Sequence, residues 1–149
     1  MQSIEEFMRE FLRVRLAEEK RTQNIRAPFR KKFYCDDLDR KSYSHILAMF
    51  QSEEIVSVSG SGSEATVVTV YKNPFYKPAS QMHRKRYHLK PAGESWSIQR
   101  VEAECPLCMG RGDESCPYCK GKHWRREGLT AEERDREDGE NPPPLPREG

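Results

Sequence analysis

The sequence predicts an α+β fold in which N-terminal helices pack on a bent, four-stranded antiparallel sheet. Apolar residues recur with the helical period of about 3.6 up to residue 51, and from residue 54 they alternate with a period of about two. Near residue 105 both patterns stop, and a cysteine-rich segment and a charged, proline-rich tail follow. We therefore divide the chain into an α+β domain at 1–104, a small module at 105–124 and a disordered tail at 125–149.

Composition agrees with one domain and a small appendage, for which 149 residues suffice. Only 35% of the residues are hydrophobic and 34% are charged, so part of the chain must lie outside a core. The net charge of +2 does not direct the chain as a whole to nucleic acid. No stretch approaches the roughly 20 apolar residues of a membrane helix, and the acidic N-terminus differs from a signal peptide. We expect a cytoplasmic protein with reduced cysteines and no membrane partner.

The first helix is expected at 3–22. Ser3 and Glu6 form a capping box, in which each side chain satisfies a free backbone N–H of the other residue. One face is apolar and consists of Ile4, Phe7, Met8, Phe11 and Leu12. The charged residues lie mostly on the other face and are Arg9, Glu10, Arg13, Glu18, Glu19 and Lys20. This pattern is typical of a helix that covers a core. The alternative is an amphipathic helix that binds a partner.

Two shorter helices are expected next. The second starts after Asn24 and places Phe29 and Phe33 on one face. The third covers about 40–51, and its core-facing stripe consists of Tyr43, Ile46, Leu47 and Phe50. His45 lies one residue off this stripe, so we interpret it as a partly exposed side chain, with a pocket histidine as the alternative.

Four strands are expected after residue 54. The segments 55–59 and 65–71 are rich in β-branched residues and flank a glycine-serine turn at 59–63, which indicates a hairpin. The third strand is expected at about 82–90 and the fourth at about 95–104. Alternation places Tyr87 and Leu89 on one face of the third strand, and Trp96 and Ile98 on one face of the fourth. The other face of the third strand then carries Arg84, Arg86, His88 and Lys90.

Residues 105–124 read CPLCMGRGDESCPYCKGKHW, in which a Cys-Pro-x-Cys-x-Gly pattern occurs twice. Two cysteines separated by two residues can bind one metal ion, and two such pairs complete a tetrahedral shell of four sulfurs. We therefore predict a small zinc finger with the ligands Cys105, Cys108, Cys116 and Cys119. Because sulfur fills the shell, no position remains for a reactive water, and the Zn²⁺ is expected to be structural. A redox-active dithiol pair and a rubredoxin-like iron site are the alternatives.

The order of helices and strands over about 3–104 resembles the nuclear transport factor 2-like superfamily, also called SnoaL-like or cystatin-like. The resemblance rests on the aromatic and acidic residues at 33–37 and on the last two strands, KRYHL at 85–89 and ESWSI at 94–98. It implies a cone-shaped fold that often encloses a pocket. Members include dehydratases, isomerases and cyclases, and others act as immunity or scaffold proteins. Members commonly form dimers through the open face of the sheet.

The cysteine segment resembles the CxxCxGxG repeats of the DnaJ cysteine-rich region. It holds two repeats where the chaperones have four, and His123 stands in place of the last glycine of the second repeat. The resemblance implies metal binding by the four cysteines. It does not carry over the handling of client proteins, because the chain has no J-domain.

Two groups of residues are candidates for a functional site besides the cysteines. A pocket in the cone would be lined by Tyr34, Asp36, His45 and Trp96, although no two titratable groups can be shown from the sequence to converge on one substrate atom. A basic surface would combine cations with an aromatic ring that could stack a nucleic-acid base. Its members are Arg84, Lys85, Arg86, His88, Lys90, Arg100, Lys122 and Trp124.

From these patterns we expect a non-catalytic, zinc-containing binding protein with a protein partner, of a scaffold or immunity-like kind. A homodimer through the sheet face is one form of that partnership. The first alternative is a nucleic-acid-binding protein that uses the basic surface and the zinc finger. The second is a dehydratase-like or isomerase-like enzyme that binds a small molecule in the cone. A solvated strand face remains the simplest interpretation of the cations.

Overall fold

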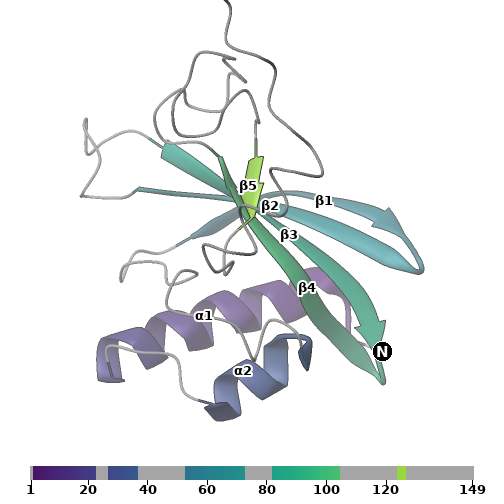
Figure 1. Ribbon diagram of the computed structural model, residues 1–149, viewed down its shortest axis with the longest axis horizontal. Helices are drawn as coiled ribbons and strands as arrows, with labels where there is room; N and C mark the ends of the chain where they lie inside the picture. The colour runs from purple at the N-terminus through teal and green to yellow at the C-terminus, as the bar shows by residue number, and fades with distance from the viewer. Residues whose placement is uncertain (1, 23–26, 37–52, 73–81, 105–123, 127–149) are drawn as a thin grey trace, which may run out of the picture.

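The computed structural model describes residues 2–22, 27–36, 53–72, 82–104 and 124–126. Two helices precede five strands, and the strands form one antiparallel sheet in the order β1-β2-β3-β4-β5 (Figure 1). The elements are α1 (Ile4–Thr22), α2 (Ala27–Phe33), β1 (Glu54–Ser61), β2 (Glu64–Lys72), β3 (Met82–Ala92), β4 (Ser95–Glu104) and β5 (Trp124–Arg126). The predicted α+β class is therefore confirmed.

Several expectations lie outside the described residues. These are the third helix at about 40–51 with His45, the four cysteines of the predicted zinc finger, Lys122, and the tail beyond residue 126. Neither of the two described helices is long and apolar enough to cross a membrane.

Helix α1 begins where the capping residues predict. The backbone N–H of Glu6 donates to Ser3 Oγ at 3.1 Å, and the Ser3 hydroxyl donates to the Glu6 carboxylate at the same distance. The carboxylate therefore binds the Ser3 hydroxyl and not the expected backbone N–H. Phe7, Met8 and Phe11 of the predicted stripe are buried, which confirms the core-facing side of the helix.

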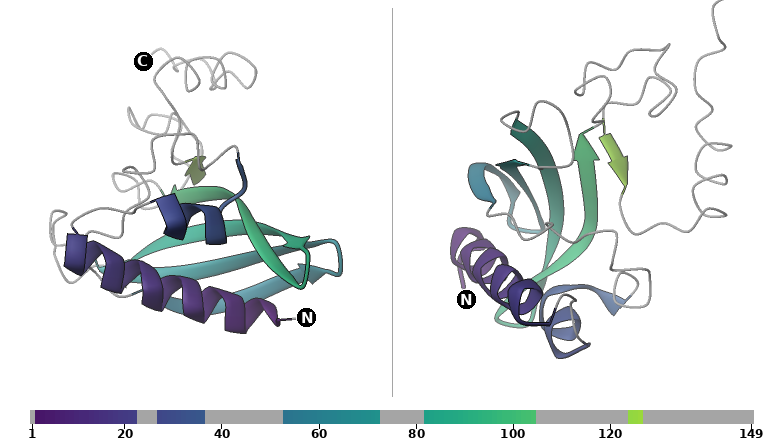
Figure 2. Two further views of the ribbon diagram at one scale, coloured as in Figure 1. Left: turned by 90° about the horizontal axis from the view of Figure 1, so that it is seen from below. Right: turned by 90° about the vertical axis from the view of Figure 1, so that its left-hand side faces the viewer.

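Both helices lie on the same side of the sheet (Figure 2). Between them and the sheet, a cluster of aromatic rings forms the centre of the core. The Phe11 ring lies 5.4 Å from Phe33, 5.7 Å from Tyr34 and 5.6 Å from Tyr87, all in edge-on arrangements. Because α1, α2 and β3 all contribute rings to this cluster, its packing fixes the two helices against the sheet.

The strands alternate as the sequence predicts, apart from a register shift in β1 between Ile55 and Ser57 and another in the pairing of β3 with β4. In β2 and β3 every second residue is buried against the helices. In β4 the pattern shifts near Gln99, because His88 pairs with Arg100 whereas Leu89 pairs with Ile98. The extra residue is a β-bulge. It turns the second half of β4 by one residue, so that Val101 faces the helices and Glu102 faces away.

Two tight turns, one at Gly62 and Ser63 and one at Gly93 and Glu94, and a short fifth strand complete the sheet. The β1–β2 hairpin turns at Gly62 and Ser63, inside the predicted turn, and Gly60 just before it has a φ of 142°. A Cβ at Gly60 would lie 2.3 Å from the Glu64 carbonyl oxygen, so only glycine fits there. The fifth strand was not predicted. It pairs with the end of β4 through Glu104 and Trp124.

Candidate functional site

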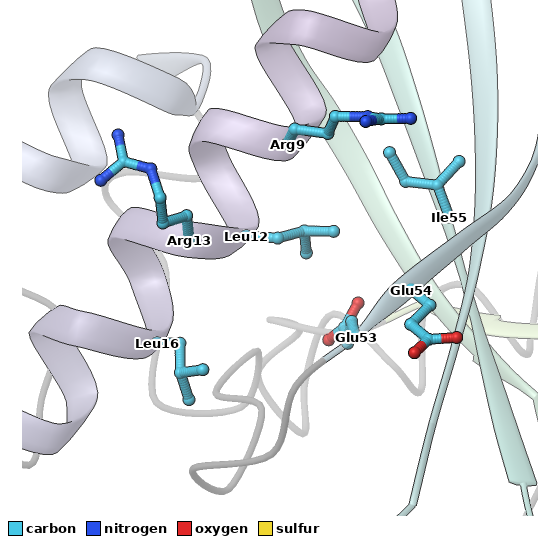
Figure 3. A pocket seen from close by; sticks show the side chains of 7 residues that line it. All are labelled: Arg9, Leu12, Arg13, Leu16, Glu53, Glu54 and Ile55. Carbon is cyan, nitrogen blue, oxygen red and sulfur yellow. The ribbon is translucent and has the colours of Figure 1, made fainter.

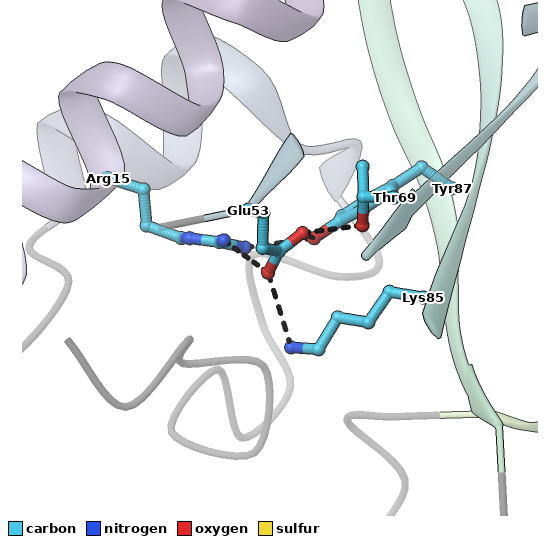
Figure 4. Close-up of polar contacts among 5 residues, drawn as sticks. All are labelled: Arg15, Glu53, Thr69, Lys85 and Tyr87. Carbon is cyan, nitrogen blue, oxygen red and sulfur yellow. Dashed lines mark hydrogen bonds and ion pairs between the residues drawn. The ribbon is translucent and has the colours of Figure 1, made fainter. Parts of the chain in front are cut away.

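A buried polar cluster lies on the helix side of the sheet, around Glu53 (Figure 4). The Glu53 carboxylate accepts hydrogen bonds from Arg15 at 2.5 Å and from the hydroxyls of Thr69 and Tyr87, each at 2.7 Å. Lys85 Nζ lies 3.9 Å from the same carboxylate. The Tyr87 hydroxyl also accepts a hydrogen bond from Arg15 at 3.0 Å. The cluster joins α1 to β2, β3 and the residue before β1.

Burial and neighbouring charges hold these groups in fixed protonation states. Burial acts to raise the pKa of Glu53, but Arg15 and Lys85, helped by the two hydroxyl groups, keep it below its ordinary value. Burial raises the pKa of Tyr87 well above its usual range. Glu53 is therefore a carboxylate and Tyr87 a neutral phenol across the physiological range. Neither group is poised to exchange a proton near pH 7, so the cluster is suited to fixing α1 on the sheet.

A shallow groove of about 360 Å³ lies beside this cluster, between α1 and the start of β1 (Figure 3). Its apolar floor is formed by Leu12, Leu16 and Ile55, and Arg9, Arg13 and Glu54 lie around it. The Glu53 side chain is fully buried and bound to Arg15. Among the described residues that line the groove there is no histidine and no tyrosine, so they do not form the pair expected for a dehydratase-like site.

The structure describes three of the four predicted pocket residues, Tyr34, Asp36 and Trp96. Tyr34 is buried in the aromatic core, where its ring lies 6.0 Å from that of Phe29. Trp96 is also buried, and its Nε1 donates to the backbone carbonyl of Gln2 at 2.9 Å. Asp36 is exposed. His45 lies outside the described residues, so within the described part Tyr34 and Trp96 are core residues and line no cavity with Asp36.

The second candidate is the face of the sheet that points away from α1 and α2, which we call the outer face. Strand register places on it Thr66, Val68, Val70, Arg84, Arg86, His88, Lys90, Arg100, Glu102, Glu104, Trp124 and Arg126. Neither described helix lies over this face (Figure 2). Most residues of the predicted basic surface therefore lie on this face, and they come from β3, β4 and β5.

Two glutamates organise the cations of the outer face. Arg84 donates to Glu104 at 2.6 Å, and Arg86 donates to Glu102 at 2.8 Å. His88 also contacts the Glu102 carboxylate through Nε2. Both glutamates are largely buried beneath these partners. Burial acts to raise the pKa of Glu102, but the bonds from His88 and Arg86 lower it to about 2.

Trp124 of β5 extends this ladder of ion pairs. The Arg86 guanidinium lies 4.6 Å from the centre of the Trp124 ring, and that of Arg84 lies 6.0 Å away. These contacts fix β5 on the sheet beyond its three backbone pairings. They also occupy part of the ring, which leaves less of it for stacking a nucleic-acid base.

The structure places six members of the predicted basic surface on one face and Lys85 on the other. Arg84, Arg86, His88, Lys90, Arg100 and Trp124 share the outer face. Lys85 does not, because it is buried on the helix side next to Glu53. Glu18 is buried as well, contrary to its expected place on the charged side of α1. Alternation could have assigned Lys85 to the face of Tyr87, but no local signal reveals the bulge that turns Glu102 and Glu104 outward.

The four cysteines lie between two paired residues. Strand β4 ends at Glu104 and β5 begins at Trp124, and these two residues are direct partners in the sheet. The Cα atoms of Glu104 and Trp124, which flank the segment 105–123, therefore lie about 5 Å apart. Holding both ends lowers the entropic cost of gathering four thiolates around one ion. Among the residues that the structure describes, no group of three or more His, Cys, Asp or Glu could hold a metal.

Comparison with protein-family models, with curated proteins and with solved structures finds no match for this chain.

Proposed function

We propose that this chain is a non-catalytic, zinc-containing binding protein of a scaffold or immunity-like kind, which binds another protein through the outer face. The observation that carries the proposal is the composition of that face. Arginine and tryptophan, which are enriched in protein interfaces, share this face with the half-buried Val68 and Val70, which pair with Arg86 and Arg84. An apolar centre with a polar rim is the usual anatomy of such an interface.

The filled interior supports a binding role over catalysis. Aromatic rings occupy the space between the helices and the sheet, and the Glu53 carboxylate already accepts three hydrogen bonds. An enzyme of the dehydratase or isomerase kind would need a cavity with two convergent titratable groups. The proposed relationship to the nuclear transport factor 2-like superfamily fits the curved sheet with helices on one side, and that superfamily includes non-catalytic members.

Zinc has a structural role in this proposal. The donor set consists of Cys105, Cys108, Cys116 and Cys119 and suits Zn²⁺, and the pairing of the flanking residues Glu104 and Trp124 supports the assignment. When bound, the ion would cross-link the four cysteines of the segment between β4 and β5. It would close the connection between β4 and β5 and so keep Trp124 and Arg126 on the outer face.

A second copy of the chain is the first partner to test. We expect light scattering after size-exclusion chromatography to give the mass of a dimer at about 100 µM protein, which is well above the dissociation constant of a standard interface. Arg86→Gln should shift the mass toward the monomer, because Arg86 lies in the centre of the ion-pair ladder. Lys31→Gln is the matched control, since Lys31 is exposed on α2, on the other side of the sheet.

A dimer that is unchanged by Arg86→Gln, with circular dichroism showing an intact fold, would place the interface elsewhere. A wild-type chain that stays monomeric at this concentration would reject the second copy as the partner. The same samples report the metal, because atomic absorption gives the zinc content of each peak.

A further inference from the structure

The geometry points to a groove on the outer face that binds an acidic peptide. The groove lies next to the ion pairs of Arg84 with Glu104 and of Arg86 with Glu102. We propose that the groove takes the carboxylate side chains of a partner protein's Asp- and Glu-rich segment. This inference rests on the proposed protein-binding function and adds to it the chemistry of the partner.

The groove crosses four strands at the end of the sheet nearer the two tight turns. It has a volume of about 360 Å³ and is lined by Glu64 and Thr66 of β2, His88 and Lys90 of β3, Arg100 of β4 and Arg126 of β5. Gln99 also lines it, so the groove lies at the β-bulge. The local increase in twist at a bulge is a physical reason for a hollow at this place.

Positive charge dominates the lining. Lys90, Arg100 and Arg126 are cations, whereas Glu64 is the one carboxylate among the described lining residues. Arg100 is held in place from within the sheet, because its Nε lies 3.8 Å from the Glu102 carboxylate. An arginine that is already oriented loses less side-chain entropy when it binds a carboxylate.

The same cations do not form a track for a nucleic acid. A phosphate backbone carries a charge at every nucleotide and is bound best along a continuous positive groove. Here Glu64 lies in the groove, and Glu102 and Glu104 lie beside it between the arginines. Among the described residues of the outer face the aromatic ring is that of Trp124, and the Arg86 guanidinium already occupies part of it. A flexible peptide with spaced carboxylates fits three separate cations better.

Fluorescence anisotropy with a labelled peptide of ten glutamates tests the proposal on the full-length protein. In about 20 mM salt, where the screening length is about 20 Å, we expect saturable binding that weakens as salt is added. The double variant Arg100→Gln/Arg126→Gln should bind at least about tenfold more weakly, because two charge-assisted contacts are lost. Lys72→Gln is the matched control, since Lys72 is exposed on the same face of β2 but outside the groove.

Three results would overturn the inference. The first is the absence of binding by the wild type in low salt, and the second is equal binding by the double variant. The third is tighter binding of a mixed-sequence, single-stranded DNA of ten nucleotides, which would assign the groove to nucleic acid. A chain that forms a zinc-containing dimer but ignores the peptide refutes this inference alone. A chain that binds the peptide but contains no zinc refutes the zinc-containing part of the proposed function instead, and leaves this inference standing.

Discussion

The substitution Glu53→Gln removes the one negative charge that lies between two buried cations. Glu53 accepts hydrogen bonds from Arg15, Thr69 and Tyr87, and it lies 3.9 Å from Lys85. Its side chain is fully buried, as is nearly all of the Arg15 side chain. Breaking a buried ion pair by removing one partner costs about 3–5 kcal/mol, because the remaining charge is left in a medium of low polarity. We expect a loss of that size, with Lys85 adding to it.

Equilibrium unfolding in urea, followed by circular dichroism at pH 7, measures the loss directly. Glu54→Gln is the control, because Glu54 is the neighbouring residue and is exposed, so its substitution should change the free energy of unfolding by less than about 0.5 kcal/mol. The double variant Arg15→Met/Glu53→Gln should lose less than the sum of the two single variants, because it also removes the buried cation that Glu53→Gln deprives of the Glu53 charge.

The total stability of a small domain is about 5–15 kcal/mol, so Glu53→Gln can leave the chain unfolded at 25 °C. That outcome agrees with the expected size. A folded variant that loses less than about 1 kcal/mol would refute the reasoning, since it would show that water or other groups reach Arg15 and Lys85 in solution.

Three further changes have definite expected results. Phe11→Ala removes a fully buried ring from the aromatic core and should cost about 3–5 kcal/mol in urea unfolding. The pKa of Glu102, at about 2 against an ordinary 4.5, means that its contribution to stability is present above about pH 4.5 and is lost as the pH falls toward 2. The stability difference between the wild type and Glu102→Gln should therefore shrink over that range. Chelation should change the fluorescence of Trp124, measured in a Trp96→Phe background, while the far-ultraviolet dichroism of α1 and β1–β4 persists.

The sequence predicts the elements well where a single local pattern is enough. The apolar stripe of α1, the alternation in β2 and β3 and the position of the first hairpin turn all depend on neighbours within a few residues. The faces of Tyr87 and Leu89 follow from the same alternation. These features need no knowledge of the rest of the fold.

The candidate sites are less predictable, because distant residues form them. Arg15 and Glu53 are 38 residues apart, and nothing near either one indicates that they will be buried together. The bulge at Gln99 reverses the faces of the residues after it, so simple alternation assigns Glu102 wrongly. Strand β5 has three residues, too few for a pattern, and it is recognised only through its pairing with β4.

Native mass spectrometry of the full-length protein as purified tests the central claim most directly, because it weighs the bound metal and counts the chains. The account predicts one zinc ion for each chain, and it predicts that Cys105→Ser/Cys116→Ser abolishes the zinc while Cys35→Ser, at the cysteine outside the segment, keeps it. A chain that carries no metal and has the mass expected for five free thiols would contradict the account. So would a metal-free chain whose mass is lower by the hydrogens that its cysteines lose when they form disulfides.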